Sequence, residues 1–414
     1  MFRRSISRRL LKWACAGMGV SALVAVGLVP ATNSGAAASK KPSGSAVVFH
    51  ADLSTTGGGS VLGATEAKAL EALEAEVNST GGIHGHPMRV VIADNNSTPT
   101  TSVALASKWV GQHVPFLLVG SLTATDRPVD ALATSSGPFI YDLSPGDYPK
   151  PTTTVFDAGL STFSDAQAYL TYLKESGLRR VAIINGTTAS GADGYTEFQK
   201  ALKTRKLKLT GIKVTDHQTF TPTAPSVTTQ MSAIKASNPQ ALVIWVTGPP
   251  VGTAFKAMSS LAMETIPTVV GNGNASFGLL TKLKTVLPKK IYFEGGPLYY
   301  TPKELHAFSG AVRSTVATFD KFVSRANGHV GDPWGLGYDP GLLLVGALKR
   351  LGIHATAKQI LAYMEHLHRV AGVFGYYTTT PKTHRGTGYK DILIDTFNGT
   401  SFVPVSGPGG VLQK

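Results

Sequence analysis

A chain of 414 residues, of which 43% are apolar, can bury a large core, and its length predicts two or three domains rather than a disordered polymer. The formal net charge is +14, from 39 Lys+Arg against 25 Asp+Glu. The basic residues form no stripe with interleaved aromatic side chains, so the composition argues against nucleic-acid binding. The 45 glycines and 24 prolines are spread along the chain, which is typical of many short elements joined by tight turns.

Residues 1–38 have the pattern of a signal peptide. The first twelve residues include five basic ones, and every residue of the stretch 13–29 is apolar or small. Ala36–Ala38 offers an Ala-x-Ala cleavage site before Ser39. The stretch 7–12 is similar to a twin-arginine export signal, and general secretion remains an alternative. We therefore expect the mature protein outside the cytoplasm, in the periplasm or at the cell surface.

The only cysteine of the chain, Cys15, lies at the start of the apolar stretch and not after it, where the acylated cysteine of a lipoprotein would have to be. We therefore predict no lipid anchor, and no disulfide in the mature chain. Five of the 39 basic residues also lie in the leader, which leaves 34 basic against 25 acidic residues after cleavage.

After a polar linker at 39–45, the fold is predicted to begin at Ala46. From there, apolar runs of strand length alternate with stretches of helical periodicity. The predicted strands are 46–49, 89–93, 116–119, 139–143, 181–184, 212–214, 241–246 and 268–270. The predicted helices are 67–77, 101–113, 126–135, 165–176, 195–206, 226–237 and 252–261.

Continuously apolar strands separated by single helices indicate parallel sheets that are covered on both faces. This many strands need two sheets. The predicted fold class is therefore α/β, with two doubly wound parallel-sheet lobes.

Ligands of such sheets bind outside the carboxyl ends of the strands. The loops at these positions are mostly rich in hydroxyl groups and uncharged, so they offer hydroxyls, backbone N–H groups and helix dipoles to a small anion or carboxylate. We predict binding without catalysis, cofactor or metal. The candidate ligand-binding residues are Ser54, Thr55, Ser121, Leu122, Thr123, Thr125, Ser144, Ser190, Gly248, Asn272 and Asn274.

A secreted dinucleotide-dependent enzyme is a remote alternative. Gly57, Gly59 and Gly63 follow a predicted strand, and Asp94 ends the next one. The third glycine comes one residue too late for the Gly-x-Gly-x-x-Gly fingerprint, which favours a tight loop over a cofactor site.

Two further patterns have structural interpretations. The pairs His84/His86 and His366/His368 have no Cys or acidic cluster beside them to complete a metal site, which favours exposed turn histidines. Asp339 precedes Pro340, an arrangement that predicts a helix N-cap followed by proline at the first helical position.

Four stretches resemble one known family: 76–85 with 94–99, 138–144 with 155–157, 271–276, and 337–344. The first reads Glu-Val-Asn-Ser-Thr-Gly-Gly-Ile-His-Gly, and the last begins Gly-Tyr-Asp-Pro. Together they are similar to the leucine/isoleucine/valine-binding family of type I periplasmic binding proteins, the solute-binding components of ABC importers. The resemblance covers nearly the whole mature chain.

The resemblance implies a Venus-flytrap of two lobes joined by three hinge crossings. The implied first lobe is 46–158 plus 296–371, and the second is 159–295 plus 372–414. It also implies a monomer that delivers a small solute to a permease and its ATPase, with the solute's carboxylate held by Ser121, Thr123, Thr125 and Ser144. A flytrap that signals to a receptor is the alternative.

The chain departs from the family in the second lobe. Where members that bind free amino acids usually have an acidic residue for the α-ammonium group, this chain has Asn272–Asn274, and Ser190-Gly191 replaces a Tyr-Gly turn. Asp193 or Glu294 could substitute. The solute therefore remains an amino acid, an amide or a small carboxylate.

Overall fold

The computed structural model describes residues 41–146, 148, 150, 153–157, 160–209, 211–271, 273–300, 304–325 and 334–413. The predicted signal peptide and Asn272 lie outside these residues. Residues 41–45 of the predicted linker form no helix or strand, and the N–H groups of Ser43 and Gly44 donate to the carbonyl of Gly85 at 3.0 and 3.1 Å.

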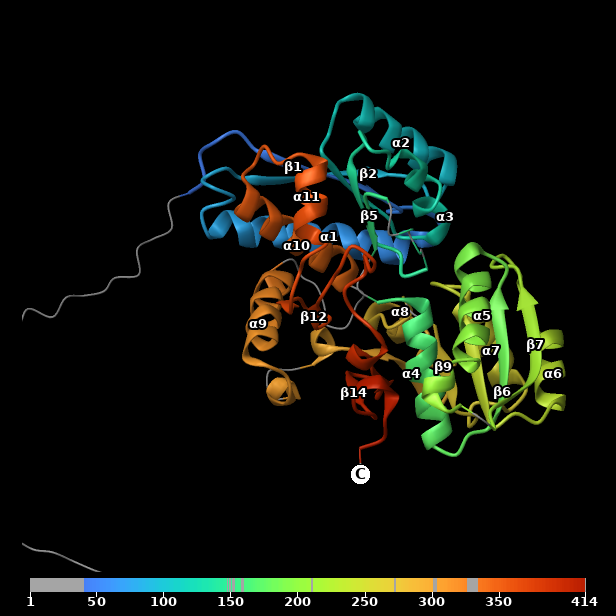
Figure 1. Cartoon of the computed structure of the whole chain (residues 1–414). Coiled ribbons are helices and arrows are strands. Elements are labelled where there is room, and N and C mark those ends of the chain that lie inside the picture. Colours follow the sequence, from blue (N-terminus) through green and yellow to red (C-terminus); the bar gives the residue numbers. More distant parts are fainter. Residues whose placement is uncertain are drawn as a thin grey trace, which may run out of the picture. The chain divides into compact units, whose positions relative to one another are not determined.

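The first sheet is parallel throughout, with strand order β2-β1-β3-β4-β5 (Figure 1). Its strands are β1 (Val47–Leu53), β2 (Met88–Asp94), β3 (Phe116–Val119), β4 (Phe139–Asp142) and β5 (Val155–Asp157). Strands β3, β4 and β5 are buried along their whole length, as expected for strands covered on both faces.

The second sheet has the order β14-β13-β10-β9-β8-β6-β7. Its strands are β6 (Arg180–Gly186), β7 (Lys213–Phe220), β8 (Ala241–Trp245), β9 (Thr268–Val270), β10 (Ile291–Gly295), β13 (Leu393–Phe397) and β14 (Phe402–Pro404). All neighbours are parallel except β13 and β14, which add an antiparallel edge. A separate hairpin pairs β11 (Val370–Ala371) with β12 (Tyr376–Tyr377).

Helices surround both sheets (Figure 1). We call the first sheet with α1, α2, α3, α10 and α11 the first lobe, and the second sheet with α4 to α8 the second lobe. The helices are α1 (Ser60–Ser79), α2 (Pro99–Gly111), α3 (Thr123–Asp126), α4 (Thr162–Glu175), α5 (Ala189–Leu202), α6 (Thr228–Ala236), α7 (Val251–Ser260), α8 (Phe277–Lys282), α9 (Gly310–Arg325), α10 (Gly335–Leu351) and α11 (Ala357–Met364). Among the described residues, no helix is long and apolar enough to span a membrane.

The chain crosses between the lobes three times: after β5, after β10 and before β13. The first crossing is joined to the segment before the third. Arg385 forms an ion pair with Asp157 and donates to the carbonyl of Leu160. His384 stacks on Phe156 with ring centroids 4.3 Å apart, and its Nδ1 lies 2.9 Å from the carbonyl oxygen of Val155. Two crossings are thereby fixed to each other by buried polar contacts.

Several predicted helices differ from the structure in their extent. The helix predicted at 67–77 covers Ser60–Ser79. The predicted helix 126–135 is instead the four-residue α3 followed by a 3-10 turn at Val129–Leu132, because Pro128 has no N–H for a continuous helix. The predicted helix 195–206 begins earlier, at Ala189, where Thr188 caps it by accepting a hydrogen bond from the N–H of Gly191.

The prediction that Asp339 is a helix N-cap is wrong. Helix α10 begins at Gly335, and Pro340 lies inside it. The Asp339 carboxylate accepts hydrogen bonds from the N–H groups of Val373 and Phe374 at 2.8 and 3.0 Å and from the Tyr377 hydroxyl at 2.8 Å. Pro340 removes the hydrogen bond that an N–H at this position would donate to the carbonyl of Leu336, and Asp339 secures the loop beside β11 and β12.

Candidate functional site

A narrow pocket lies where the carboxyl ends of both sheets meet. The first lobe contributes loops after β3 and β4 together with side chains of α1 and α10, and the second lobe contributes loops after β8 and β9 and the starts of α4 and α5. The lining residues are Leu62, Ser121, Thr123, Ser144, Pro145, Gly146, Thr162, Ser190, Trp245, Thr247, Gly273 and Leu336. None of them carries a charge.

Hydroxyl groups connect the two lobes inside this pocket. The Oγ atoms of Thr123 and Ser144 lie 2.9 Å apart, and Ser190 of the second lobe donates to the Thr123 hydroxyl at 3.4 Å. Ser190 and Thr162 stand in the first turns of α5 and α4, whose N-termini therefore face the pocket. A helix start favours a negatively charged ligand group where its N–H groups are free. At α4 the N–H groups of Thr162, Phe163 and Ser164 already donate within the protein, to Pro145, Tyr148 and Ser161.

Ser121 is strained and its hydroxyl is already used. Its φ of +89° is unusual for any residue other than glycine. The hydroxyl accepts from the N–H of Ser54 at 3.1 Å and donates to the fully buried carboxylate of Glu66. Ser121 therefore faces the pocket while its polar contacts point into the first lobe.

Replacing Ser121 by Ala or by Gly separates the effect of the backbone strain from the effect of the hydrogen bonds. Ser121→Ala leaves Ser54 N–H and the Glu66 carboxyl without their partner and keeps the strained φ, so we expect the free energy of unfolding to fall by about 2 kcal/mol. Ser121→Gly loses the same hydrogen bonds but relaxes the backbone, and we expect a loss about 1 kcal/mol smaller. Urea unfolding of both variants checks this; an Ala variant as stable as the wild type would contradict it.

Burial raises the pKa of Glu66 to about 7, and the hydrogen bond from Ser121 opposes this only in part. In the unfolded chain the carboxyl ionises near its ordinary pKa of 4.5. The unfolded state therefore loses its proton first as the pH rises, and the free energy of unfolding falls between about pH 4.5 and 7, by about 3 kcal/mol from this group.

Glu66→Gln should remove that part of the pH dependence. We expect the variant to match or exceed wild-type stability at pH 8, and the difference between the two proteins to change with pH only across the window of Glu66. Urea unfolding at pH 5, 6, 7 and 8 measures it. Parallel pH profiles for both proteins would show that Glu66 is not buried as described.

Asp193 on α5 is one of several carboxylates that contact residues of the pocket wall; Glu66, Asp126 and Glu294 do so through Ser121, Ser144 and Gly273. A Cβ atom built on Gly146 would lie 3.1 Å from its Oδ2, and its side chain is hydrogen bonded to Thr162; both neighbours line the pocket. Oδ2 is buried and accepts no hydrogen bond from the described residues. Burial raises the pKa of Asp193 to about 6, assisted by Glu197 and opposed by Thr162, Arg127 and Lys200.

Glu294, the other candidate acid, differs from Asp193 in the hydrogen bonds of its carboxylate. Its carboxylate accepts from the Tyr169 hydroxyl at 2.7 Å and from the N–H of Gly273 at 3.3 Å, and burial raises its pKa to about 7. Glu294 therefore lies beneath the loop after β9 and supports it from below. Of the two acids, Asp193 has the uncommitted oxygen.

The structure places four of the predicted residues in the pocket wall: Ser121, Thr123, Ser144 and Ser190. Ser54 and Thr125 are buried behind the wall, where their hydroxyls donate to Asn95 and to the carbonyl of Leu122. Thr55 and Leu122 are half-buried and lie outside the lining, Thr55 beside Asp94.

Gly248 and Asn274 shape the second-lobe loops instead of lining the pocket. The Asn274 side chain accepts from the N–H of Gly248 at 2.9 Å and donates to the carbonyls of Val246 and Gly271 at 2.8 and 2.9 Å. All of its polar atoms are thereby used within the protein. Asn272 lies outside the described residues.

Sequence reasoning missed the apolar part of the wall, formed by Leu62, Trp245 and Leu336. Trp245 is the last residue of β8, so the rule that selected strand ends could have included it. Leu62 and Leu336 lie in helices and carry no such signal. The glycine at position 63 needs no cofactor: a Cβ there would meet the Ser54 carbonyl at 2.3 Å, so it permits α1 to pack against the loop after β1.

Metal chemistry finds no support in the part of the chain that the structure describes, where no three His, Cys, Asp or Glu side chains are grouped to hold an ion.

Comparison with curated proteins gives a short match. Residues of this chain are 31% identical over 100 positions to the "Leu/Ile/Val-binding protein homolog 1" of Brucella abortus (strain 2308), and the same figures apply to the homologue from Brucella suis. The match covers 24% of this chain and spans only 26% of the length of those relatives.

Solved structures agree in fold. An extracellular ligand-binding receptor from Rhodopseudomonas palustris HaA2 superposes with a TM-score of 0.76 at 17% identity, over 87% of this chain and all of the other. The branched-chain amino acid transporter substrate binding protein LivJ of Streptococcus pneumoniae, solved with isoleucine, gives a TM-score of 0.71 at 17% identity, over 86% and 97% of the two chains.

The family model described as "Periplasmic binding protein" matches residues 52–390, which include the parallel strands of both sheets except most of β1, and all the described pocket residues. Members of this family bind solutes and are not enzymes, so the remote dinucleotide-enzyme alternative falls. With most of its length matched by that model, the chain belongs to the periplasmic binding protein family.

Proposed function

We propose that this protein is the exported solute-binding component of an ABC importer, and that its interlobe pocket captures an α-amino acid with a branched apolar side chain. The observation that supports it most is the combination of an uncharged, hydroxyl-rich pocket with the buried, uncommitted carboxylate oxygen of Asp193 beside the second-lobe part of its wall.

Each part of such a solute has a partner. The solute carboxylate is placed among the hydroxyls of Thr123 and Ser144 and at the start of α5. The ammonium group pairs with Asp193, which replaces the acid missing from the loop at 272–274. The apolar side chain packs against Leu62, Trp245 and Leu336.

The names of relatives support the choice of solute class. The curated relatives are named for leucine, isoleucine and valine, and LivJ was solved with isoleucine. The proposed working form is a monomer beginning at Ser39, released by cleavage of the signal peptide and free of a lipid anchor. It would present its closed form to a permease that is driven by an ATPase.

Binding requires the lobes to separate and close again. The contact between Ser190 and Thr123 joins the lobes in the present arrangement, so the solute enters only when this contact opens. Micromolar affinity corresponds to about 8 kcal/mol, which buried hydrogen bonds, one ion pair and an apolar wall supply after ordering costs.

Thermal unfolding of residues 39–414 against a panel of solutes tests the proposal. The panel holds α-amino acids, short amides, aromatic acids and small carboxylates. A solute at a hundredfold its dissociation constant stabilises the folded state by about 2.7 kcal/mol and raises the midpoint visibly. We expect shifts with leucine, isoleucine or valine. Shifts only with solutes lacking an ammonium group would overturn the amino-acid assignment, and no shift with any solute would overturn solute capture.

A further inference from the structure

The net positive charge of residues 41–414 comes from one lobe. Residues 160–295 contain 15 Lys+Arg and 7 Asp+Glu, whereas the rest of 41–414 contains 18 of each. Three of the seven acids, Asp165, Glu197 and Glu294, are also buried. Residues 160–295 of the second lobe therefore present a strongly basic surface, and the rest of 41–414 is neutral overall.

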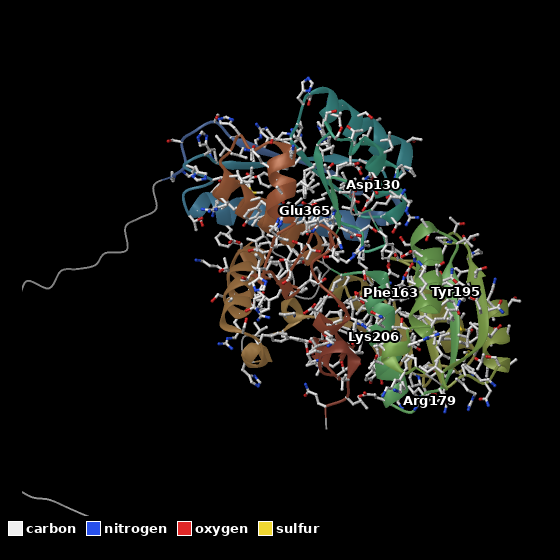
Figure 2. The ribbon with its side chains drawn as sticks, in the orientation of Figure 1. Asp130, Phe163, Arg179, Tyr195, Lys206 and Glu365 are labelled. Atoms are coloured by element: carbon white, nitrogen blue, oxygen red, sulfur yellow. The ribbon has the colours of Figure 1, made fainter. Side chains whose placement is uncertain are left out.

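Most of these basic residues lie at one end of the second lobe. They precede or begin parallel strands, or end helices, and these positions are opposite to the carboxyl ends that form the pocket. Figure 2 shows Arg179 at the end of the lobe away from the pocket-side loops. We call this surface the basic pole; it consists of Arg179, Arg180, Lys203, Arg205, Lys206, Lys208, Lys213, Lys235, Lys289 and Lys290.

The charges of the basic pole are not neutralised locally. All its side chains are exposed except that of Arg179, which is half-buried, and no ion pair joins any of them to a carboxylate of the described residues. Arg180 and Lys235 donate to backbone carbonyls, of Asn238 and Leu261. Lys203, Arg205 and Lys208 line a surface hollow between α5 and β7.

Helix dipoles do not account for this surface. Cations are favoured at helix C-termini, and Lys235 and Lys203 stand at such positions. The first lobe has the same parallel architecture, with Lys108 and Lys349 at its helix ends, yet it has no charge excess. The excess is a property of the second lobe and not of the fold.

The composition of the basic pole fits a charged layer better than a protein partner. Protein interfaces have an apolar or aromatic core and are depleted in lysine. Among the described residues only Tyr148, Leu351 and Val411 are large apolar side chains with high exposure, and Val411 alone lies near this end, beside the end of α4. A single valine supplies no such core.

We propose that the basic pole docks the protein on the anionic phospholipid surface of the membrane that it serves. Clusters of Lys and Arg bind such surfaces within about one Debye length. A chain without a lipid anchor is then retained near its importer by charge alone. In this orientation the pocket faces away from the lipid.

Co-sedimentation of residues 39–414 with vesicles tests this. One preparation contains phosphatidylglycerol in phosphatidylcholine, and the other is pure phosphatidylcholine. We expect partitioning at least about tenfold higher onto the anionic vesicles, and a steep loss when salt rises from about 0.05 M to about 0.3 M.

Two variants with equal loss of charge locate the surface. The pole variant carries Lys203→Gln, Arg205→Gln, Lys206→Gln and Lys208→Gln, and the control carries Lys68→Gln, Lys108→Gln, Lys349→Gln and Arg350→Gln in the first lobe. We expect the pole variant to lose binding at least about tenfold and the control less than about threefold. Unchanged thermal unfolding and solute binding in both variants separate this test from the proposed function.

Equal losses in the two variants would overturn the proposal, because binding would then follow net charge and not the pole. Absence of binding to anionic vesicles would overturn it as well. Retention only on membranes that contain the importer would also overturn it, because the basic pole would then bind an acidic surface of the importer and not the lipid.

Discussion

Replacing Arg385 by Met is expected to lower the free energy of unfolding by about 3–5 kcal/mol, the largest stability effect that we predict for a single change. Arg385 forms an ion pair with the buried carboxylate of Asp157 and donates to the carbonyl of Leu160, so the variant leaves a buried charge without its main partner. Urea unfolding measures the effect. Because Arg385 joins two of the three crossings, the loss concerns the hinge itself.

Two further variants make this result interpretable. Arg350→Met removes an exposed arginine from the end of α10, and we expect a change within about 0.5 kcal/mol. Combining Arg385→Met with Asp157→Asn also removes the buried negative charge and should restore part of the lost stability. If Arg385→Met unfolds at the same urea concentration as Arg350→Met, the ion pair does not stabilise the hinge.

The largest effect on binding is expected from Asp193→Asn, which should weaken the affinity for an α-amino acid at least about 100-fold. Truncating one partner of a buried ion pair costs about 2–5 kcal/mol, and about 2.7 kcal/mol corresponds to 100-fold. The effect should be specific to the ammonium group. Asp216→Asn, a matched change on β7 whose side chain accepts from Gln218, should leave the affinity within about twofold.

The pH dependence of binding has a definite sign. With its pKa near 6, Asp193 is ionised in the free protein above pH 6 and protonated below it. Only the ionised form pairs with ammonium, so the affinity should fall about tenfold per pH unit below pH 6 and level off above it. Calorimetric titration between pH 5 and 8 gives the profile. A flat wild-type profile, or the same slope in Asp193→Asn, would rule out Asp193 as the ammonium partner.

The fold could be predicted because its signal is local and repeated. Strand β3 was predicted at its observed bounds, 116–119. A short apolar run that lies between two stretches of helical periodicity indicates a buried strand. The late strands β13 and β14 were not predicted. They are short antiparallel additions that depend on pairing with β10, which is distant in sequence.

The candidate site was predictable only where topology alone determines position. Thr123, Ser144 and Ser190 lie in loops after parallel strands, and the fold brings such loops to one edge. Asp193 was named as a possible substitute acid, but sequence cannot tell it from Glu294. Their difference lies in burial and in partners: Glu294 is occupied by Tyr169 and Gly273, and Asp193 keeps one oxygen uncommitted.

The role of Asp339 could not be predicted from the local sequence. Its position before a proline suggests a cap, and local sequence holds no hint that its carboxylate binds the backbone of residues 373 and 374. A long-range polar contact of this kind also joins the first and the last of the four stretches that resemble the family, since the Tyr338 hydroxyl donates to Glu76. Motif residues that look functional in sequence can therefore serve the packing of α10 against α1.

The most direct test is a calorimetric comparison of leucine with 4-methylpentanoic acid, its counterpart without the amino group, on residues 39–414 at pH 7.5. The two solutes share the carboxylate and the branched side chain and differ only in the group assigned to Asp193. We predict that leucine binds at least about 100-fold more tightly. Equal affinity for the two, or binding of the acid alone, would contradict the account of the pocket.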